Sequence, residues 1–241
     1  MTKSKRVITV LLIIFLLIFA TIYYGMYFFG LSGMHQKINH VEDKIKVACI
    51  GDSTTYGHGI KNWKNNNYPS LLQKELGDDY YVVNFGLNGA CVQSYAQQPY
   101  TDNEIFKESV LFDADIIIFM FGTNDSSAYN FRSKGDFKKE YSELIRNYLD
   151  SENNPEIILC TPPSAFYRNG KTDGTAEYDV EPDNLKIISE AVNELANEMN
   201  YNLVDCFSAT SQHPDWFGKD GIHPNSEGAS ELAKLISDSI K

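Results

Sequence analysis

Residues 45–57 read IKVACIGDSTTYG, an apolar run that stops at Gly51-Asp52 and is followed by Ser53. A short apolar run bounded by turn residues is typical of a buried strand. Gly, Asp and Ser are also the commonest turn residues, so the simplest interpretation of this boundary is a turn. The alternative is a strand that presents the Ser53 hydroxyl as a nucleophile, which requires partner residues elsewhere in the chain.

Four further strand-like runs follow, and they alternate with segments whose apolar residues recur at three- and four-residue steps. We expect strands at 45–50, 81–85, 115–121, 156–160 and 202–206, and helices at 69–76, 103–111, 136–149, 183–200 and 226–240. Short apolar strands separated by helices predict an α/β fold whose parallel sheet is covered on both faces. Ligands bind at the carboxyl ends of the strands in such sheets, so the first three strand ends are candidate site positions.

The N-terminal segment is apolar and preceded by basic residues. An uncharged run from Val7 to Phe29 forms a helix of roughly 35 Å, enough to cross a bilayer core. We favour an uncleaved anchor over a cleaved signal peptide, whose apolar core usually has only about 7–15 residues. The basic residues before it predict a cytoplasmic N terminus and an extracytoplasmic domain. The chain then divides into a cytoplasmic basic tail (1–6), a transmembrane anchor (7–29), a stalk (30–43) and a globular domain (44–241).

The net charge and the spacing of the cysteines argue against several classes of partner and of metal or redox site. The 241-residue chain has a formal charge of −11, and none of its 32 acidic residues precedes Glu42. The domain after the anchor is therefore acidic, which disfavours nucleic acid as a partner. The four cysteines form no C-x-x-C pair, so their spacing indicates neither zinc nor a redox motif. We expect Cys49, Cys160 and Cys206 to be buried thiols, with a disulfide as the alternative in an oxidising compartment. Abundant Asn, Lys and Ile are typical of an AT-rich bacterial source.

A catalytic serine requires a base and an acid that orients the base. Of the five histidines, His223 is the best candidate base because Asp220 precedes it by three residues in the motif DGIHP. This spacing lets the carboxylate reach one imidazole nitrogen while the other faces Ser53. His58, in the loop after Ser53, is either a pocket residue or a solvated side chain.

Hydrogen-bond donors for the oxyanion are expected at the other strand ends. Gly89 in NFGLNGA can bring its backbone N–H close to a substrate, and Asn124 in GTND offers a side-chain amide. Together with the Ser53 N–H, they would make three donors around one oxygen. Asp52 and Asp125 are expected to support the site structurally by holding its turns.

These motifs, in this order, resemble the four blocks of the SGNH (GDSL-like) hydrolase family. Gly51-Asp52-Ser53 carries the nucleophile, NFGLNG the oxyanion glycine at Gly89, GTND the donor Asn124, and DGIHP the acid and base. Thr54 stands where the family often has Leu or Ile, which removes no catalytic group. The resemblance implies a three-layer α/β/α flavodoxin-like sandwich with a central parallel sheet of about five strands, hydrolysis through an acyl-enzyme, and neither metal nor other cofactor.

Two loops are expected to select the substrate. Residues 56–68 and 162–182 mix aromatic with amide and hydroxyl side chains, which suits a sugar ring, although the same residues could simply pack the loops. Neither loop has the long apolar run that a fatty-acyl groove needs. We therefore expect a membrane-anchored, extracytoplasmic serine esterase that removes short acyl groups, most simply acetyl, from carbohydrate or cell-wall polysaccharide. The alternatives are a lysophospholipase or thioesterase, an O-acetyltransferase, and a non-catalytic glycan-binding protein on the same scaffold.

Overall fold

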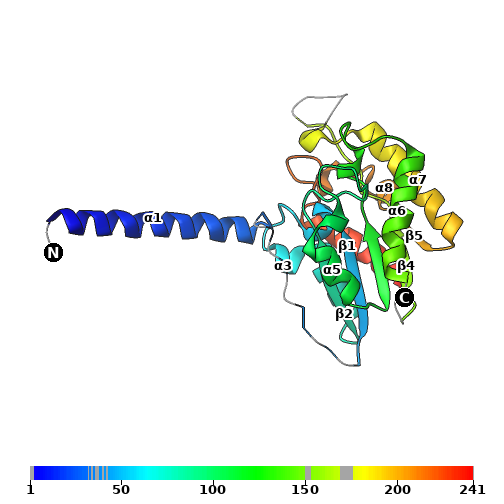
Figure 1. Ribbon diagram of the computed structural model, residues 1–241, viewed down its shortest axis with the longest axis horizontal. Coiled ribbons are helices and arrows are strands. Elements are labelled where there is room, and N and C mark those ends of the chain that lie inside the picture. The colour runs from blue at the N-terminus through cyan, green and yellow to red at the C-terminus, as the bar shows by residue number, and fades with distance from the viewer. Residues whose placement is uncertain are drawn as a thin grey trace.

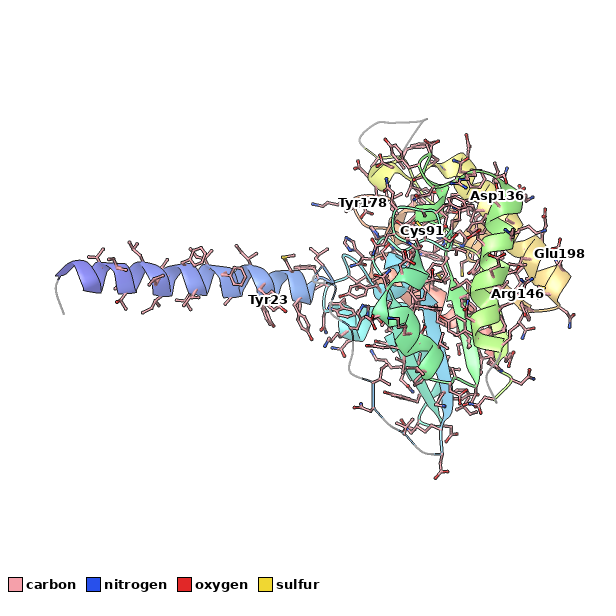
Figure 2. All side chains as sticks on the ribbon, in the orientation of Figure 1. Tyr23, Cys91, Asp136, Arg146, Tyr178 and Glu198 are labelled. Atoms are coloured by element: carbon pink, nitrogen blue, oxygen red, sulfur yellow. The ribbon has the colours of Figure 1, made fainter. Side chains whose placement is uncertain are left out.

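The computed structural model describes residues 3–31, 33, 35, 38–39, 41, 43–149, 153–168 and 176–240. A single rod-like helix, α1 (Lys3–Phe28), projects from an α/β domain (Figure 1). Most of its apolar side chains are exposed, whereas Tyr27 and Phe28 at its domain end are half-buried, and Tyr23 lies on the part of the helix outside the domain (Figure 2). Within the described part of the chain, Val7–Phe28 is the one helix long and apolar enough to cross a membrane.

The domain is built on five parallel strands in the order β2-β1-β3-β4-β5, which is the flavodoxin-like order. The strands are β1 (Ile45–Gly51), β2 (Tyr80–Gly86), β3 (Ile116–Met120), β4 (Glu156–Cys160) and β5 (Asn202–Val204). Every predicted strand is present, with its ends within two residues of the prediction. β5 ends two residues before its predicted end, because the Asp205 side chain accepts a hydrogen bond from the backbone N–H of Ser208 and so caps the following helix. The predicted α/β/α sandwich is confirmed.

The five long helices agree with the prediction, and the short ones were not foreseen. The long helices are α4 (Tyr68–Leu76), α5 (Glu104–Leu111), α6 (Lys134–Leu149), α7 (Pro182–Met199) and α9 (Ser226–Ile240). The short helical segments are α2 (Ser53–Tyr56), α3 (Trp63–Asn66), α8 (Cys206–Thr210) and the 3₁₀ turns η1 (Tyr100–Asp102), η2 (Asn124–Ser126), η3 (Glu177–Asp179) and η4 (Pro214–Trp216). Segments of three to five residues are too short to show a helical period.

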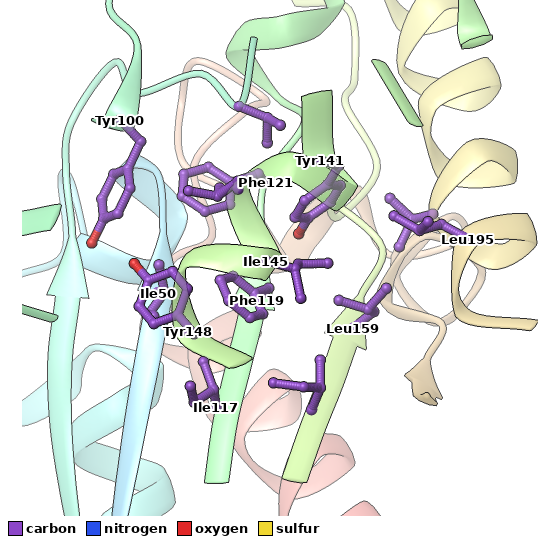
Figure 3. Close-up of a cluster of buried hydrophobic side chains, with 14 of the residues drawn as sticks. Ile50, Tyr100, Ile117, Phe119, Phe121, Tyr141, Ile145, Tyr148, Leu159 and Leu195 are labelled. Carbon is purple, nitrogen blue, oxygen red and sulfur yellow. The ribbon is translucent and has the colours of Figure 1, made fainter. Parts of the chain in front are cut away.

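Alternate side chains of the buried strands pack into two separate layers. On one face, Phe119 and Phe121 pack against Tyr141 and Tyr148 of α6, in a cluster that α5 and α7 complete (Figure 3). On the other face, Ile118 belongs to a cluster that includes side chains of α4 and α9. The cysteines are buried and free, so the prediction of buried thiols at Cys49, Cys160 and Cys206 is confirmed.

The predicted stalk, residues 30–43, touches the domain where the structure describes it. Ile38 packs against the larger core cluster, and Asn39 N donates a hydrogen bond of 2.8 Å to the Tyr81 hydroxyl. The segment therefore lies against the domain at these residues, and its role as a stalk stays a prediction. Positions 32, 34, 36, 37, 40 and 42 lie outside the described residues.

Gly51, the last residue of β1, is expected to tolerate no side chain. A Cβ there would overlap the Met120 carbonyl and the Thr55 hydroxyl. We expect Gly51→Ala to lower the free energy of unfolding by about 1–3 kcal/mol, the usual cost of overpacking a core. Denaturant unfolding followed by tryptophan fluorescence measures this. The matched control is Gly135→Ala in α6, where the nearest atom lies 3.9 Å away. Wild-type stability in Gly51→Ala would contradict the packing argument.

Candidate active site

Ser53, His223 and Asp220 form a continuous hydrogen-bonded chain. Ser53 opens α2 directly after β1, and its Oγ lies 2.9 Å from Nε2 of His223. The other ring nitrogen, Nδ1, lies 2.8 Å from Oδ2 of Asp220. The structure therefore brings together the predicted nucleophile, base and orienting acid in the geometry of a serine-hydrolase triad.

The local turn around Asp220 fixes the direction of its carboxylate. Oδ1 accepts hydrogen bonds from the backbone N–H of Ile222, at 2.9 Å, and from the backbone N–H of His223, at 3.0 Å. These bonds leave Oδ2 for the imidazole. Burial alone would raise the pKa of Asp220, but the hydrogen bond and charge of His223, together with these N–H groups, hold it at about 2. Because the carboxylate stays ionised, Nδ1 keeps its proton and Nε2 is free to accept the proton of Ser53.

The three predicted oxyanion donors lie around the same cavity. Ser53 is the first residue of α2, where a backbone N–H has no acceptor within the helix. Gly89 has a φ of +79°, and a Cβ there would lie 2.7 Å from Oε1 of Gln98. Asn124 Nδ2 donates to the Ala90 carbonyl at 3.0 Å, so one amide hydrogen holds the side chain and the other is available to a substrate. Their role as an oxyanion hole stays a prediction.

A cavity of about 270 Å³ opens beside Ser53. It is lined by Ser53, His58, Asn88, Gly89, Asn124, Tyr178, Val180, Ile222 and His223. The sequence interpretation missed four of these residues: Asn88, Tyr178, Val180 and Ile222. Asn88 and Ile222 lie inside the motifs NFGLNG and DGIHP, which could have indicated them. Tyr178 and Val180 lie inside the predicted substrate-selecting loop 162–182, but no motif there distinguishes them from their neighbours.

His58 belongs to this cavity, so the pocket alternative for this residue holds. Its ring centroid lies 4.4 Å from that of His223. Burial and, to a smaller extent, the nearby charge of His223 lower the pKa of His58 to about 4, against the weaker opposing effects of the Asp220 carboxylate and of a hydrogen bond with Asn88. His58 is therefore neutral at pH 7, and it does not compete with the protonated His223 for the charge of Asp220.

Asp52 and Asp125 are buried behind the cavity rather than exposed in it. The Asp52 side chain accepts from Thr54 N at 2.8 Å and so caps α2. Oδ1 of Asp125 accepts from the backbone N–H of Val92 at 2.9 Å and from both the backbone and side-chain nitrogens of Gln93 at 3.2 Å. These contacts tie the tips of β1 and β3 to neighbouring segments, which agrees with the supporting role expected for both residues.

In the first predicted substrate-selecting loop, residues 56–68, the aromatic side chains are not available to contact a sugar ring. Trp63 is only 1% exposed and stacks on Tyr56 with ring centroids 4.5 Å apart. Its face is covered by protein, so the packing alternative holds for the aromatic residues of this loop. In the second loop, Tyr178 is exposed, and residues 169–175 lie outside the described residues. No group of three or more His, Cys, Asp or Glu suited to a metal occurs among the residues that the structure describes.

The fold and the contacts of Ser53, His223 and Asp220 are those of a serine hydrolase, with the predicted nucleophile just after the first strand. The chain belongs to the GDSL-like Lipase/Acylhydrolase family, a family of carboxylic ester hydrolases, because the model of that family matches residues 49–230. This agrees with the resemblance of the four sequence motifs.

The proteins similar to this chain include esterases that carry different names. An acetylxylan esterase from Xylanibacter ruminicola is 30% identical over 221 residues, covering 83% of this chain and 44% of that protein. The chain thus spans less than half of that relative. A carbohydrate acetylesterase from Sinorhizobium meliloti superposes with a TM-score of 0.65 at 18% identity, over 82% of this chain and 98% of that chain. An aryl esterase from M. smegmatis superposes with a TM-score of 0.66 at 19% identity, over 81% of this chain and 97% of that chain. Both structural likenesses show the shared fold.

Asp125 is expected to make stability depend on pH. Burial raises its pKa from 3.8 to about 7, so the folded state holds the proton more tightly than the unfolded state. Wild-type stability should then fall as pH rises from about 4 to 7. Asp125→Asn keeps an oxygen for the same N–H donors but cannot ionise, so its free energy of unfolding relative to wild type should increase across that window.

Denaturant unfolding of both proteins at pH 5, 6, 7 and 8 tests this. The difference between them is the informative quantity, because other titrating groups are common to both. A difference that stays constant with pH would contradict the assignment of the raised pKa to Asp125.

Proposed function

We propose that this protein is a membrane-anchored, extracytoplasmic esterase that removes acetyl groups from carbohydrate esters through an acetylated Ser53. The observation that carries the chemistry is the 2.9 Å contact of Ser53 Oγ with His223 Nε2 at the edge of a small cavity. The names of the relatives, an acetylxylan esterase and a carbohydrate acetylesterase, support the substrate class.

The geometry supports a two-step acyl transfer. Ser53 Oγ attacks the ester carbonyl while His223 Nε2 takes its proton, and Asp220 stabilises the imidazolium that results. The three donors receive the negative charge that develops on the carbonyl oxygen. The tetrahedral intermediate expels the sugar alkoxide, which takes the proton from Nε2. Water then attacks the acetyl-serine with His223 again as base, and acetate leaves as Ser53 regains its proton.

The size of the cavity favours a short acyl group. At about 270 Å³ it lies just below the range of about 300–1,000 Å³ that is usual for drug-sized ligands. Val180 and Ile222 are buried apolar residues in its lining, suited to contact a methyl group. A fatty-acyl chain would need to leave the cavity and lie on the surface.

Tyr178 supplies an exposed aromatic face beside the catalytic base. Its side chain is 60% exposed, and its ring centroid lies 5.2 Å from that of His223. Its φ of +55° is strained for a bulky residue, and strain of this kind often accompanies a functional position. The turn is held by a 2.8 Å bond from Ala176 N to Val180 O. Such a face suits contact with the sugar that carries the ester.

The anchor itself is inferred from α1. Within the 22-residue apolar stretch Val7–Phe28, an 18-residue window has a mean hydropathy of 2.8, and none of that window is buried. Outside a membrane, this surface would be an apolar patch much larger than soluble proteins tolerate. Basic residues at 1–6 favour a cytoplasmic N terminus.

Rates on acetyl, butyryl and octanoyl esters of one alcohol test the acyl preference. We expect turnover to be highest on acetyl and to be lost by about eight carbons, because the cavity must hold the acyl group. Ser53→Ala is the blank and should show no enzymatic turnover. A rate that climbs with chain length would favour a lipase-like activity, and equal rates in the wild type and the Ser53→Ala variant would exclude the mechanism.

Substitution of Tyr178 tests the carbohydrate site. We expect Tyr178→Ala to raise KM for acetylated xylo-oligosaccharide about 2- to 10-fold, because about 0.5–1.5 kcal/mol of aromatic contact is lost. KM for ethyl acetate, which has no ring, should change little. Tyr129→Ala is the matched control, because Tyr129 is 72% exposed and lies outside the cavity lining. Equal increases in KM for both esters would contradict a sugar contact.

A further inference from the structure

The end of α1 is joined to the rim of the catalytic cavity by hydrogen bonds. The backbone N–H of Gly59 donates to the Phe29 carbonyl at 2.9 Å. The side-chain amide of Asn88, a residue of the cavity lining, approaches the Gly30 carbonyl at 3.4 Å. These contacts connect the chain directly after α1 to the segment that follows α2 and to the loop after β2 that carries Asn88.

Gly30 fits closely against the turn that ends the nucleophile helix. It is buried, and its φ of +66° closes α1, with Leu31 N donating to the Met26 carbonyl at 2.8 Å. A Cβ on Gly30 would lie 2.7 Å from the Gly57 carbonyl and 3.2 Å from Trp63 Cβ. Only glycine suits both the backbone conformation and this approach.

Tyr27, one turn earlier, contacts the same region through its ring. Trp63 meets it edge-to-face with centroids 6.4 Å apart, and Lys64 Nζ lies 4.8 Å from the Tyr27 ring centroid. Trp63 in turn stacks on Tyr56, the last residue of α2. A continuous set of packed rings thus runs from α1 to the helix that begins with Ser53.

We propose that Tyr27–Leu31 is a positioning element of the active site, and that it supports the turn at Gly57-His58 and thereby the orientation of Ser53. Gly57 is the C-cap of α2, and its N–H donates to the Ser53 carbonyl at 2.9 Å. The His58 N–H donates to the same carbonyl at 3.0 Å. A shift of this turn therefore acts on Ser53 through two hydrogen bonds.

The arrangement also restricts where the substrate is found, a point that rests on the proposed function. The contacts of Phe29 and Gly30 leave no free linker between α1 and the cavity rim. With α1 in a bilayer, the cavity is held at the membrane surface. The substrates it reaches are then acetyl esters on carbohydrate chains that run close to the membrane, and the distal parts of long polymers are out of range.

Steady-state kinetics of the full chain in detergent tests the positioning role with a soluble acetyl ester. We expect Gly30→Ala to lower kcat by between about ten- and a hundred-fold, the effect of a small displacement of a reacting group. KM should stay near the wild-type value, because the cavity lining is retained. Tyr27→Ala, which removes contacts without adding atoms, should lower kcat in the same direction by a smaller factor.

Two glycines and one tyrosine provide matched controls. Gly25→Ala lies in α1 with no atom within 4 Å of the new Cβ, and Gly33→Ala has a φ of +68° but likewise contacts nothing. Gly33→Ala thus reproduces the backbone strain of Gly30→Ala without the contact. Tyr24→Ala is the control for Tyr27→Ala, since Tyr24 is 65% exposed.

The thermal unfolding temperature of each variant separates positioning from general destabilisation. The proposal holds if kcat falls in Gly30→Ala and Tyr27→Ala while the domain melts as in wild type and the three controls keep wild-type kcat. It is overturned if both variants keep wild-type kcat, or if kcat falls only in proportion to the unfolded fraction. Ser53-dependent turnover by the wild type, measured in the same assay, tests the proposed function separately.

Discussion

The hydrogen bond between Ser53 Oγ and His223 Nε2 joins residues that are 170 positions apart, and the site depends on the fold that brings them together. β1 lies between β2 and β3, so Ser53 stands at the point where the strand order reverses, the usual ligand position in such sheets. The loop that carries His223 is held by a bridge between Phe217 and Pro224 and by a 2.8 Å bond from Gly218 N to the His223 carbonyl. Rigid elements therefore support both partners of this contact.

The surroundings of Asp220 and Asp125 shift the pKa values of these two carboxyl groups in opposite directions. Asp220 accepts three hydrogen bonds, one from the catalytic imidazole, and its pKa is held at about 2. Asp125 also accepts hydrogen bonds, but it is fully buried without a cation beside it, and its pKa rises to about 7. His58 is kept neutral by burial. Asp220 therefore carries a full negative charge at neutral pH, where it can stabilise the protonated His223.

The features that could be predicted from the sequence are those that local patterns encode. Apolar runs indicated the five strands, and four short motifs indicated Ser53, Gly89, Asn124 and the Asp220–His223 pair. The remainder depends on contacts between distant segments. Trp63 turns inward because Tyr56 and Tyr27 pack on it, Tyr178 reaches the cavity through a left-handed turn, and His58 points at His223 because α2 ends at Gly57. No spacing rule specifies the direction of a loop side chain.

The central claim is that His223 activates Ser53 as the nucleophile of an ester hydrolase. Covalent labelling with a fluorophosphonate, followed by mass spectrometry of the protein and its peptides, tests it most directly. The account predicts one adduct, located on the peptide that contains Ser53, which forms rapidly in the wild type, far more slowly in His223→Ala and not at all in Ser53→Ala. A protein that hydrolyses acetyl esters yet carries no adduct on Ser53, or is labelled equally fast without His223, would contradict the account.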